Sequence, residues 1–253
     1  MILSSSVLAR TVWFLDYDGS LCPHQEIWEE RTYDPVVIHK TLNKLKSREA
    51  ELFWNTGRRA ESLGSVYEPF LEIPGYFIHG SCFWQDKHDW IGPSVPESLR
   101  KAAQEIAHRV PHLKLEIKQT SLRFTPSPGK PLDEVRKALD ELAHITPGEW
   151  QWISGPRGSE LLARGFDKAV AVQREMQTRI GKIPIAVGDD PLDRPAIEAA
   201  IRLGGYGIVV GEGCGWVTEI PHRPDQVIFF EKPHGVLDLI DDLASNLEAT
   251  VAH

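Results

Sequence analysis

The segment Thr11-Val-Trp-Phe-Leu-Asp-Tyr-Asp-Gly-Ser20 decides the fold of this chain. Its first five residues are β-branched, aromatic or aliphatic, a composition typical of a buried strand. The run ends abruptly in a polar turn that carries Asp16 and Asp18. Two carboxylates this close at a strand end can share a divalent cation, and one of them can be a covalent nucleophile, although Asp and Gly are also ordinary turn formers.

Similar apolar runs recur along the chain and alternate with stretches of helical spacing. They cover residues 51–54, 183–187, 207–210 and 226–230. The run at 51–54 ends in Asn55-Thr56-Gly57, and the run at 183–187 ends in Gly188-Asp189-Asp190. Apolar strands followed by helices predict a parallel sheet covered on both faces, and such a sheet binds its ligand beyond the carboxyl ends of its strands. The three polar turns are therefore expected at one edge of the sheet.

The middle of the chain follows a different pattern. It reads as helix, strand, strand, repeated twice, and the predicted segments are residues 97–109, 113–118, 120–125, 132–143, 149–153 and 159–163. This order predicts a small α+β layer inserted into the parallel-sheet domain. We assign residues 1–84 and 158–253 to the core and residues 85–157 to the insert.

Composition limits the classes of partner. The 253 residues include 28 Lys and Arg against 36 Asp and Glu, a formal net charge of −8. No nucleic-acid partner is expected, because such binding needs a positive surface, whereas a small anionic substrate stays open. No apolar run is long enough for a membrane span, so no membrane partner is expected either. The scattered Cys22, Cys82 and Cys214 fit neither a disulfide framework nor a zinc site, and with no signal peptide recognisable we expect a cytoplasmic protein.

Two further groups of residues point to phosphate and metal chemistry. Thr56-Gly57-Arg58 offers a hydroxyl and backbone N–H groups after a strand, which can bind an anion but can also be a simple helix cap. Asp189, Asp190 and Asp193 gather three carboxylates beside another strand end. So much negative charge is hard to explain without a cation or a strong partner.

In this order the segments resemble the motifs of the haloacid dehalogenase-like phosphohydrolases. Asp16-Tyr-Asp-Gly-Ser20 is similar to the first motif, Thr56 to the second, Lys168 to the third, and Asp189 with Asp193 to the fourth. The insert between Thr56 and Lys168 resembles the type IIB cap. The resemblance covers essentially the whole chain and implies an α/β fold: a Rossmann-like parallel-sheet core with an inserted α+β cap domain of the C2B type.

Within that superfamily the chain resembles the trehalose-6-phosphate phosphatases. The similar phrases are Phe14-Leu-Asp-Tyr-Asp-Gly19, His79-Gly80, Leu115-Glu-Ile-Lys118 and Gly188-Asp-Asp190. The resemblance implies an Mg²⁺-dependent phosphatase that converts trehalose 6-phosphate to trehalose and phosphate through an aspartyl-phosphate. Phosphatases for mannosyl-3-phosphoglycerate or sucrose 6-phosphate stay open as alternatives, as does a catalytically silent binding protein. A sugar phosphate is the expected small-molecule partner, and the protein is expected to be a monomer or a small homo-oligomer.

The resemblance also implies roles for the catalytic residues. Asp16 would attack phosphorus and bind Mg²⁺. Asp18 would protonate the leaving group and then activate water, with its backbone carbonyl on the metal. Thr56 and the Gly57 N–H would hold a phosphoryl oxygen, and Lys168 would neutralise charge on Asp16.

The remaining expectations concern the metal and the sugar. The expected metal site comprises Asp16, Asp18, Asp189, Asp190 and Asp193. Carboxylates can accept hydrogen bonds from sugar hydroxyls, and cationic side chains can donate to them, although a solvated sheet face would carry the same residue types. The expected substrate-binding residues are Gly57, Arg58, Glu116, Lys118, Arg123 and Glu160.

Overall fold

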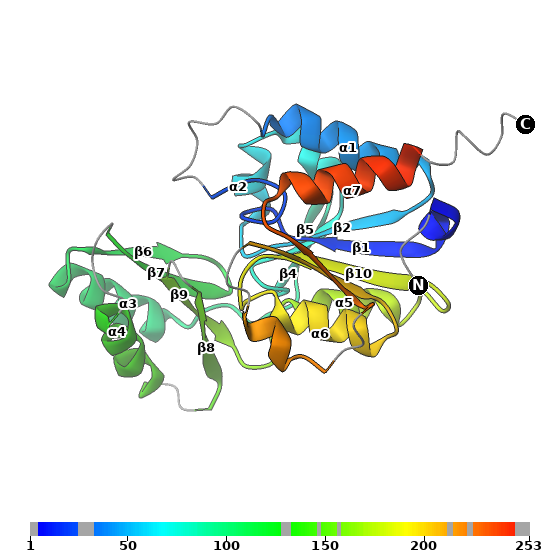
Figure 1. Ribbon diagram of the computed structural model, residues 1–253. Helices are drawn as coiled ribbons and strands as arrows, with labels where there is room; N and C mark the ends of the chain where they lie inside the picture. The colour runs from blue at the N-terminus through cyan, green and yellow to red at the C-terminus, as the bar shows by residue number, and fades with distance from the viewer. Residues whose placement is uncertain are drawn as a thin grey trace, which may run out of the picture. The chain divides into compact units, whose positions relative to one another are not determined.

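The structure of the protein is a computed structural model that describes residues 5–24, 33–127, 133–145, 148–155, 158–211, 215–221 and 225–245 (Figure 1). The chain divides into two compact units. The first comprises Met1–Asp89 and Asp167–His253, and the second comprises Trp90–Phe166. Cys214 lies outside the described residues.

An eight-stranded sheet forms the centre of the first unit, in the order β12-β11-β10-β1-β2-β3-β4-β5. Its strands are β1 (Thr11–Leu15), β2 (Glu51–Asn55), β3 (Gly75–Phe77), β4 (Cys82–Gln85), β5 (Lys87–Trp90), β10 (Ile183–Gly188), β11 (Tyr206–Val210) and β12 (Val227–Phe230). The neighbours from β12 to β3 pair in parallel, and β4 runs antiparallel to β3. The predicted parallel-sheet core is confirmed.

Helices cover both faces of this sheet (Figure 1). They are α1 (Pro35–Ser47), α2 (Ala60–Gly64), α5 (Ala169–Met176), α6 (Arg194–Arg202) and α7 (His234–Ser245), with short 3₁₀ turns at Ser5–Arg10, Glu68–Glu72 and Gly215–Glu219. The pair α1 and α7 packs on one face and the pair α5 and α6 on the other. Within the described part of the chain, no helix combines the length and the hydrophobicity needed to span a membrane.

Helix α1 illustrates why these segments fold locally as they do. The Asp34 carboxylate accepts a hydrogen bond from the Val36 N–H at 2.9 Å, and Pro35 occupies the first turn, where its missing N–H costs nothing. Ile38, Leu42 and Leu45 are buried and recur at the spacing of one helix face. The apolar face fixes the helix against the core, and the cap fixes where it begins.

The register of the central strands brings the polar turns together. Leu15 of β1 lies opposite Val187 of β10 on one side and Trp54 of β2 on the other. The three strands therefore end at the same level, and the residues that follow them emerge at one edge of the sheet. The sequence predicts this convergence, and it positions the site described below.

The second unit is an antiparallel sheet with two helices. Its sheet has the order β6-β7-β9-β8. The elements are α3 (Glu97–Arg109), β6 (Leu113–Ile117), β7 (Ser121–Pro126), α4 (Asp133–Ala143), β8 (Trp150–Gly155) and β9 (Gly158–Ala163). Side chains from both helices and all four strands form one hydrophobic cluster that includes Leu99, Leu113, Leu122, Val135, Trp150 and Leu161.

The structure differs from the predicted organisation in two places. The second unit comprises Trp90–Phe166, whereas residues 85–157 were predicted. Its end lies further along the chain because β9 pairs with both β7 and β8 inside the smaller sheet, and its start is later because β5 joins the eight-stranded sheet. The sequence also gave no sign of β3, β4 and β5. Strand β3 is only three residues long, β4 is four residues long and partly exposed, and β5 is a largely exposed edge strand that begins with Lys87. None of the three carries the long apolar run of a central strand.

The buried cluster of the second unit makes a stability prediction. Ile106→Ala removes a side chain that is 2% exposed, whereas Ile180→Ala removes one that is 95% exposed. We expect the first change to lower the free energy of unfolding by about 2–5 kcal/mol and the second by less than about 0.5 kcal/mol. Urea denaturation followed by circular dichroism measures both. Equal stability of the two variants would contradict the packing described here.

Candidate active site

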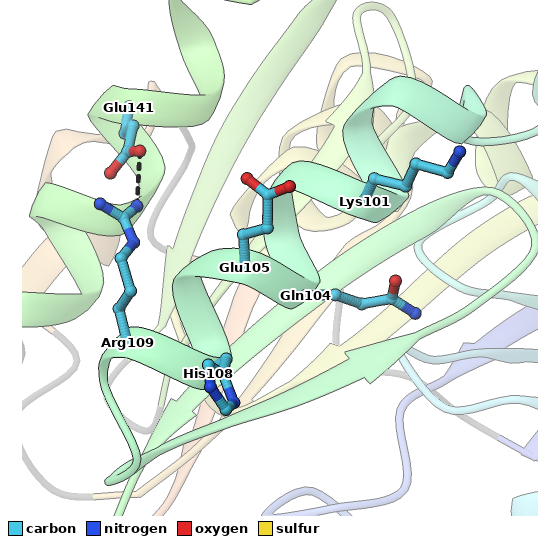
Figure 2. Close-up of a pocket in the computed structure, with 6 residues that line it drawn as sticks. All are labelled: Lys101, Gln104, Glu105, His108, Arg109 and Glu141. Atoms are coloured by element: carbon cyan, nitrogen blue, oxygen red, sulfur yellow. Dashed lines mark hydrogen bonds and ion pairs between the residues drawn. The ribbon is translucent and has the colours of Figure 1, made fainter.

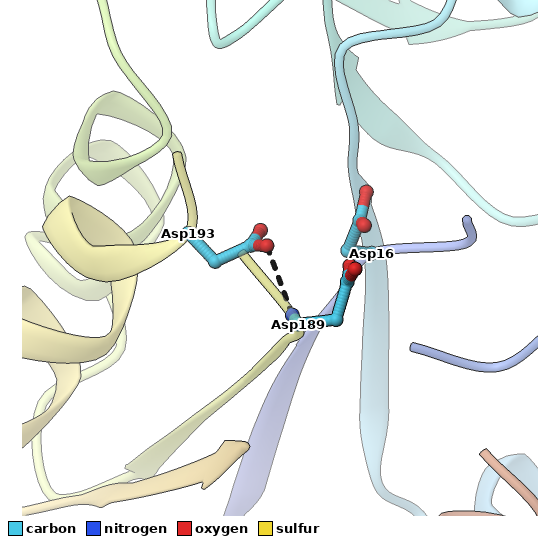
Figure 3. A group of neighbouring side chains, drawn as sticks. All are labelled: Asp16, Asp189 and Asp193. Carbon is cyan, nitrogen blue, oxygen red and sulfur yellow. Dashed lines mark hydrogen bonds between the residues drawn. The ribbon is translucent and has the colours of Figure 1, made fainter. Parts of the chain in front are cut away.

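Three carboxylates meet at the carboxyl edge of the parallel sheet (Figure 3). Asp16 follows β1, Asp189 follows β10, and Asp193 directly precedes α6. One oxygen of each lies within 4.8 Å of the others, and Asp16 and Asp193 are buried. This cluster comes from segments far apart in the sequence, and the parallel strands bring them together.

A single buried ammonium group balances part of this charge. The Nζ atom of Lys168, just before α5, lies 2.9 Å from Asp16 Oδ1 and 2.5 Å from Asp193 Oδ1. The backbone carbonyl of Lys168 accepts a hydrogen bond of 2.9 Å from Asn55 Nδ2 at the end of β2. Lys168 thereby connects the loops that follow three strands of the sheet.

Burial and mutual repulsion shift the titration of these groups. Burial raises the pKa of Asp16 to about 6, and repulsion from Asp189 and Asp18 adds to the rise, while Lys168 opposes it. Burial also raises the pKa of Asp193 well above its usual range. The pKa of Lys168 is raised despite burial, since Asp16 and Asp193 attract its charge. All three pKa shifts arise because several carboxylates and one ammonium group are buried together.

The donor set fits a hard divalent cation. It consists of carboxylate oxygens alone, and their number exceeds that of the neighbouring ammonium groups. Mg²⁺ prefers oxygen ligands and is usually held by one or two carboxylates together with water or phosphate. Asp16 and Asp189 are the pair best suited to hold it, because Asp193 is already engaged in other bonds.

Asp193 organises the turn that carries Asp189. Its Oδ2 atom accepts hydrogen bonds from the backbone N–H groups of Asp189, at 3.0 Å, and Asp190, at 3.2 Å. A Cβ atom on Gly188 would lie 2.1 Å from the Cβ of Asp193, so only glycine fits there. The Asp190 carboxylate accepts a hydrogen bond from the Leu192 N–H at 2.7 Å. Among the described residues, the acidic cluster does not include Asp190. Of the five expected metal-binding residues, the cluster contains three.

Asp18 is bound by an arginine. Arg58 Nε lies 2.6 Å from Asp18 Oδ2, and Arg58 Nη2 lies 2.7 Å from Oδ1, which is the bidentate arrangement that orients a carboxylate most strongly. The guanidinium also donates to Ser62 Oγ at 3.1 Å and lies 5.5 Å from the centre of the Tyr17 ring. The sequence places Arg58 among the substrate-binding residues, and the structure adds this contact with the expected acid–base group.

Thr56 and Gly57 form a tight turn against a strained loop. Thr56 is buried, and its Oγ1 accepts from the Arg58 N–H at 3.3 Å. A Cβ atom on Gly57 would lie 2.6 Å from His79 Nε2. Ile78 and His79 have φ values of 51° and 53°, which are rare for residues with side chains and frequent at functional sites. The strain accompanies two backbone hydrogen bonds, from Ile78 N to Arg58 O and from His79 N to Thr56 O, that tie the two loops together.

Two polar residues beside the cluster were missed by reasoning from the sequence. Ser20 Oγ lies 3.4 Å from Asp16 Oδ2 and 3.2 Å from Asp189 Oδ1, and Ser20 is fully buried. His24 Nε2 lies 2.8 Å from Asp189 Oδ2. Ser20 belongs to the quoted first motif and could have been named from it, whereas nothing in the pattern around His24 distinguishes it from a surface histidine.

The second unit groups the expected sugar-binding residues on one face of its sheet. Glu116, Arg123 and Glu160 lie directly opposite one another across β6, β7 and β9, on the face away from the hydrophobic cluster. Lys118 Nζ lies 2.8 Å from Glu160 Oε1, and Ser121 Oγ donates to the same oxygen. The side chains of Lys118 and Glu160 are only 2% and 3% exposed. They therefore form a buried ion pair.

Comparisons with known proteins identify relatives of the same kind. No family model matches the chain. A trehalose-6-phosphate phosphatase of Escherichia coli is 26% identical over 225 residues, which are 81% of this chain and 79% of that protein. A probable trehalose-phosphate synthase of Arabidopsis thaliana is 23% identical over 96% of this chain, and the match spans 31% of that relative's length.

Solved structures share the whole architecture. The C-terminal domain of a Candida albicans trehalose-6-phosphate phosphatase superposes with a TM-score of 0.73 at 16% identity, covering 96% of this chain and 97% of that one. A sucrose-phosphatase from Synechocystis superposes with a TM-score of 0.63 at 15% identity, covering 92% and 98%. A haloacid dehalogenase-like hydrolase from Bacteroides thetaiotaomicron gives 0.67 at 16% identity, with 92% and 98% covered.

The chain has the haloacid dehalogenase-like fold. The predicted resemblance to trehalose-6-phosphate phosphatases and to this wider group is confirmed, including a parallel-sheet core with an additional antiparallel layer. These relatives support the prediction from the sequence that the protein is a phosphoric monoester hydrolase.

The position of Lys168 between two buried carboxylates makes a prediction about stability. Lys168→Met leaves Asp16 and Asp193 buried without their shared cation. We therefore expect the free energy of unfolding to fall by about 3–5 kcal/mol. Denaturation in the absence of divalent metal measures this change. Lys182→Met is the matched control, because Lys182 is partly exposed and 3.3 Å from Glu51; it should cost no more than about 1 kcal/mol. A Lys168 variant as stable as this control would mean that the buried ion pairs do not hold the site together.

Proposed function

We propose that this protein is an Mg²⁺-dependent phosphatase that hydrolyses a sugar phosphate, with trehalose 6-phosphate as its substrate. The observation that carries the proposal is the position of Asp16: a buried carboxylate at a strand end, 2.9 Å from the Lys168 ammonium and within 4.8 Å of Asp189 and Asp193. A nucleophile for phosphorus needs a fixed orientation and nearby positive charge, because phosphoryl transfer relies on positioning and electrostatic stabilisation.

Asp16 and Asp189 would hold the metal ion, together with the backbone carbonyl of Asp18. When bound, Mg²⁺ would neutralise charge on the phosphate and orient it toward Asp16. Asp190 and Asp193 remain candidates from the expected metal set, but the bonds of Asp193 to Lys168 and to two backbone N–H groups favour a supporting role for it. Removal of divalent metal is therefore expected to stop turnover.

The reaction would proceed in two steps. In the first, an oxygen of Asp16 forms a bond to phosphorus while the bond from phosphorus to the sugar oxygen breaks, and Asp18 gives its proton to the departing alkoxide. In the second, Asp18 takes a proton from water, whose oxygen attacks phosphorus and releases phosphate from Asp16.

Neighbouring residues would assist both steps. Lys168 would offset charge on Asp16 and on the transferring group, and Thr56 Oγ1 with the Gly57 N–H would bind a phosphoryl oxygen. The bidentate contact from Arg58 would orient Asp18 as a carboxylate, the form that takes a proton from water in the second step. In the first step Asp18 bears a proton, so this contact would open and release Arg58. Its guanidinium could also donate to the phosphate, since its fork of N–H groups matches phosphate as well as carboxylate.

The second unit would select the sugar. On the sheet face away from the hydrophobic cluster, Glu116 would supply an acceptor for sugar hydroxyls and Arg123 a donor, while Glu160, the third residue of this row, is buried and already accepts from Lys118 and Ser121. The buried pair of Lys118 and Glu160 would give this face a fixed shape. Trehalose 6-phosphate is favoured because the Escherichia coli relative matched over most of both chains is named for it. The sucrose-phosphatase neighbour makes sucrose 6-phosphate the main rival, followed by mannosyl-3-phosphoglycerate.

We further propose that the protein acts in the cytoplasm, as a monomer or a small homo-oligomer, without a nucleic-acid or membrane partner. The free, buried thiols of Cys22 and Cys82 suit a reducing compartment. The net charge of −8 disfavours binding to nucleic acid.

Phosphate release from a panel of sugar phosphates tests the function. Trehalose 6-phosphate should give the highest kcat/KM, and EDTA should abolish turnover until Mg²⁺ is added back. A higher kcat/KM for sucrose 6-phosphate or mannosyl-3-phosphoglycerate would replace the proposed substrate and leave the chemistry intact. Activity that survives chelation would refute the role of the metal, and no release from any member of the panel would favour a silent binding protein.

The proposed nucleophile makes a separate prediction. Asp16→Asn should lower kcat by at least about 10³-fold, because an amide cannot form the aspartyl-phosphate. Asp238→Asn, an exposed position on α7, should keep activity within about two-fold of the unmodified protein. Circular dichroism checks that both variants are folded. Substantial turnover by a folded Asp16→Asn protein would exclude the covalent pathway.

A further inference from the structure

We propose that His24 is a positioning residue that holds the Asp189 carboxylate in place for a divalent cation. This inference rests on the proposed function, because it concerns the metal that the phosphatase would use. His24 lies in the loop after β1, and its ring contacts the acidic cluster from outside the quoted motifs. The contact is direct, at 2.8 Å between His24 Nε2 and Asp189 Oδ2.

The imidazole completes a set of restraints on the two carboxylates that face each other. Asp189 Oδ2 is held by His24, and Asp16 Oδ1 is held by Lys168 at 2.9 Å. The other oxygen of each, Asp189 Oδ1 and Asp16 Oδ2, lies within 3.2 Å and 3.4 Å of the same Ser20 hydroxyl. Each carboxylate thus has one oxygen fixed by a nitrogen donor, while its second oxygen lies beside the Ser20 hydroxyl.

Gly19 provides the space in which His24 and Asp189 meet. A Cβ atom at this position would lie 2.1 Å from Asp189 Oδ2 and 2.4 Å from His24 Nε2. The φ of Gly19 is 83°, a conformation that residues with side chains rarely adopt. The backbone conformation and the missing side chain are therefore both needed for the imidazole to reach the carboxylate.

Hydrogen-bond chemistry indicates that His24 acts through Asp189 and is not itself a metal ligand. An ionised carboxylate only accepts hydrogen bonds, so the contact requires a hydrogen on His24 Nε2. The Nε2 lone pair is then unavailable to a metal. The Nδ1 atom is buried and has no hydrogen-bond partner among the described residues, and because the two ring nitrogens project in different directions it is directed away from the carboxylate that Nε2 contacts. His24 would therefore influence the ion by orienting the Asp189 carboxylate.

In metal sites of other proteins, loss of such a contact weakens metal binding, because the freed carboxylate must be ordered again when the ion binds. Removal of a hydrogen-bond donor behind a metal-ligating group typically costs 10–100-fold in metal affinity. We expect His24→Ala to fall in that range for Mg²⁺. His24→Gln should recover part of the loss, because its amide N–H can donate to the same oxygen.

Isothermal titration calorimetry of Mg²⁺ into the full-length protein, without substrate, measures this directly. His88→Ala is the matched control, because His88 Nε2 also lies close to a carboxylate, 2.5 Å from Glu61 Oε1, but away from the acidic cluster. The control should bind Mg²⁺ with the affinity of the unmodified protein. In turnover assays the His24→Ala defect should appear as a higher Mg²⁺ requirement, with kcat restored within a few-fold at saturating Mg²⁺. Melting curves without metal show whether each variant is folded.

The outcomes separate this inference from the proposed function. If the unmodified protein binds no Mg²⁺, the proposed metal dependence fails as well. If it binds Mg²⁺ and Asp189→Ala does not, unchanged or tighter binding by folded His24→Ala would overturn the role of His24 alone. An effect on Mn²⁺ with none on Mg²⁺ would also overturn it, because it would make the imidazole a direct ligand of softer metals.

The second unit also has a surface hollow, formed by α3 and α4. The hollow, of about 600 Å³ on the outer side of α3 and α4, is lined by charged and polar residues, including Lys101, His108 and Arg109 (Figure 2). Arg109 already pairs with Glu141 at 2.6 Å across the hollow. Positive and negative side chains alternate there, as on an ordinary solvated helix face.

Discussion

The site depends on one buried ammonium group shared by two buried carboxylates. Lys168 lies between Asp16 and Asp193, at 2.9 Å and 2.5 Å, and all three side chains are almost completely removed from water. Burying a charge is strongly unfavourable unless it is paired, so the loops that carry these residues are fixed relative to one another. The parallel sheet makes this possible, because β1 and β10 end at the same level.

Lys168 balances only part of the negative charge of the acidic cluster. Asp189 joins Asp16 and Asp193 in the cluster, and burial raises the pKa of Asp16 to about 6. A phosphate dianion would be repelled by such a site unless a cation were bound in it. The same excess explains why hydrogen-bond donors such as Ser20 and His24 surround the cluster. The stability of the loops and the proposed attraction for a metal would thus have one electrostatic origin.

Under the proposed function, chemistry and selectivity would be divided between the two units. The first unit carries the acidic cluster and the Thr56 turn, while the second presents a row of charged residues on an antiparallel sheet. The second sheet has its own hydrophobic cluster against α3 and α4. Under the proposed function, its polar face could therefore change with the sugar while the groups that act on phosphorus stay the same.

Much of the fold and part of the site followed from local pattern. The apolar runs that became β1, β2 and β10 are read from consecutive residues, and the polar turns after them occupy one edge because parallel strands all end on the same side. Strand β4 and the edge strand β5 were not predicted, because both are short and partly exposed and lack the long apolar run of a central strand.

What the sequence determined by itself was therefore the type of sheet, the edge where chemistry is expected and the residue types gathered there. Only the tertiary structure decided the partners: Asp18 with Arg58, Lys118 with Glu160, and Asp189 with His24. Strand and helix patterns arise from neighbours along the chain, whereas the pairing of two charges depends on distances set by the packing of segments far apart in sequence.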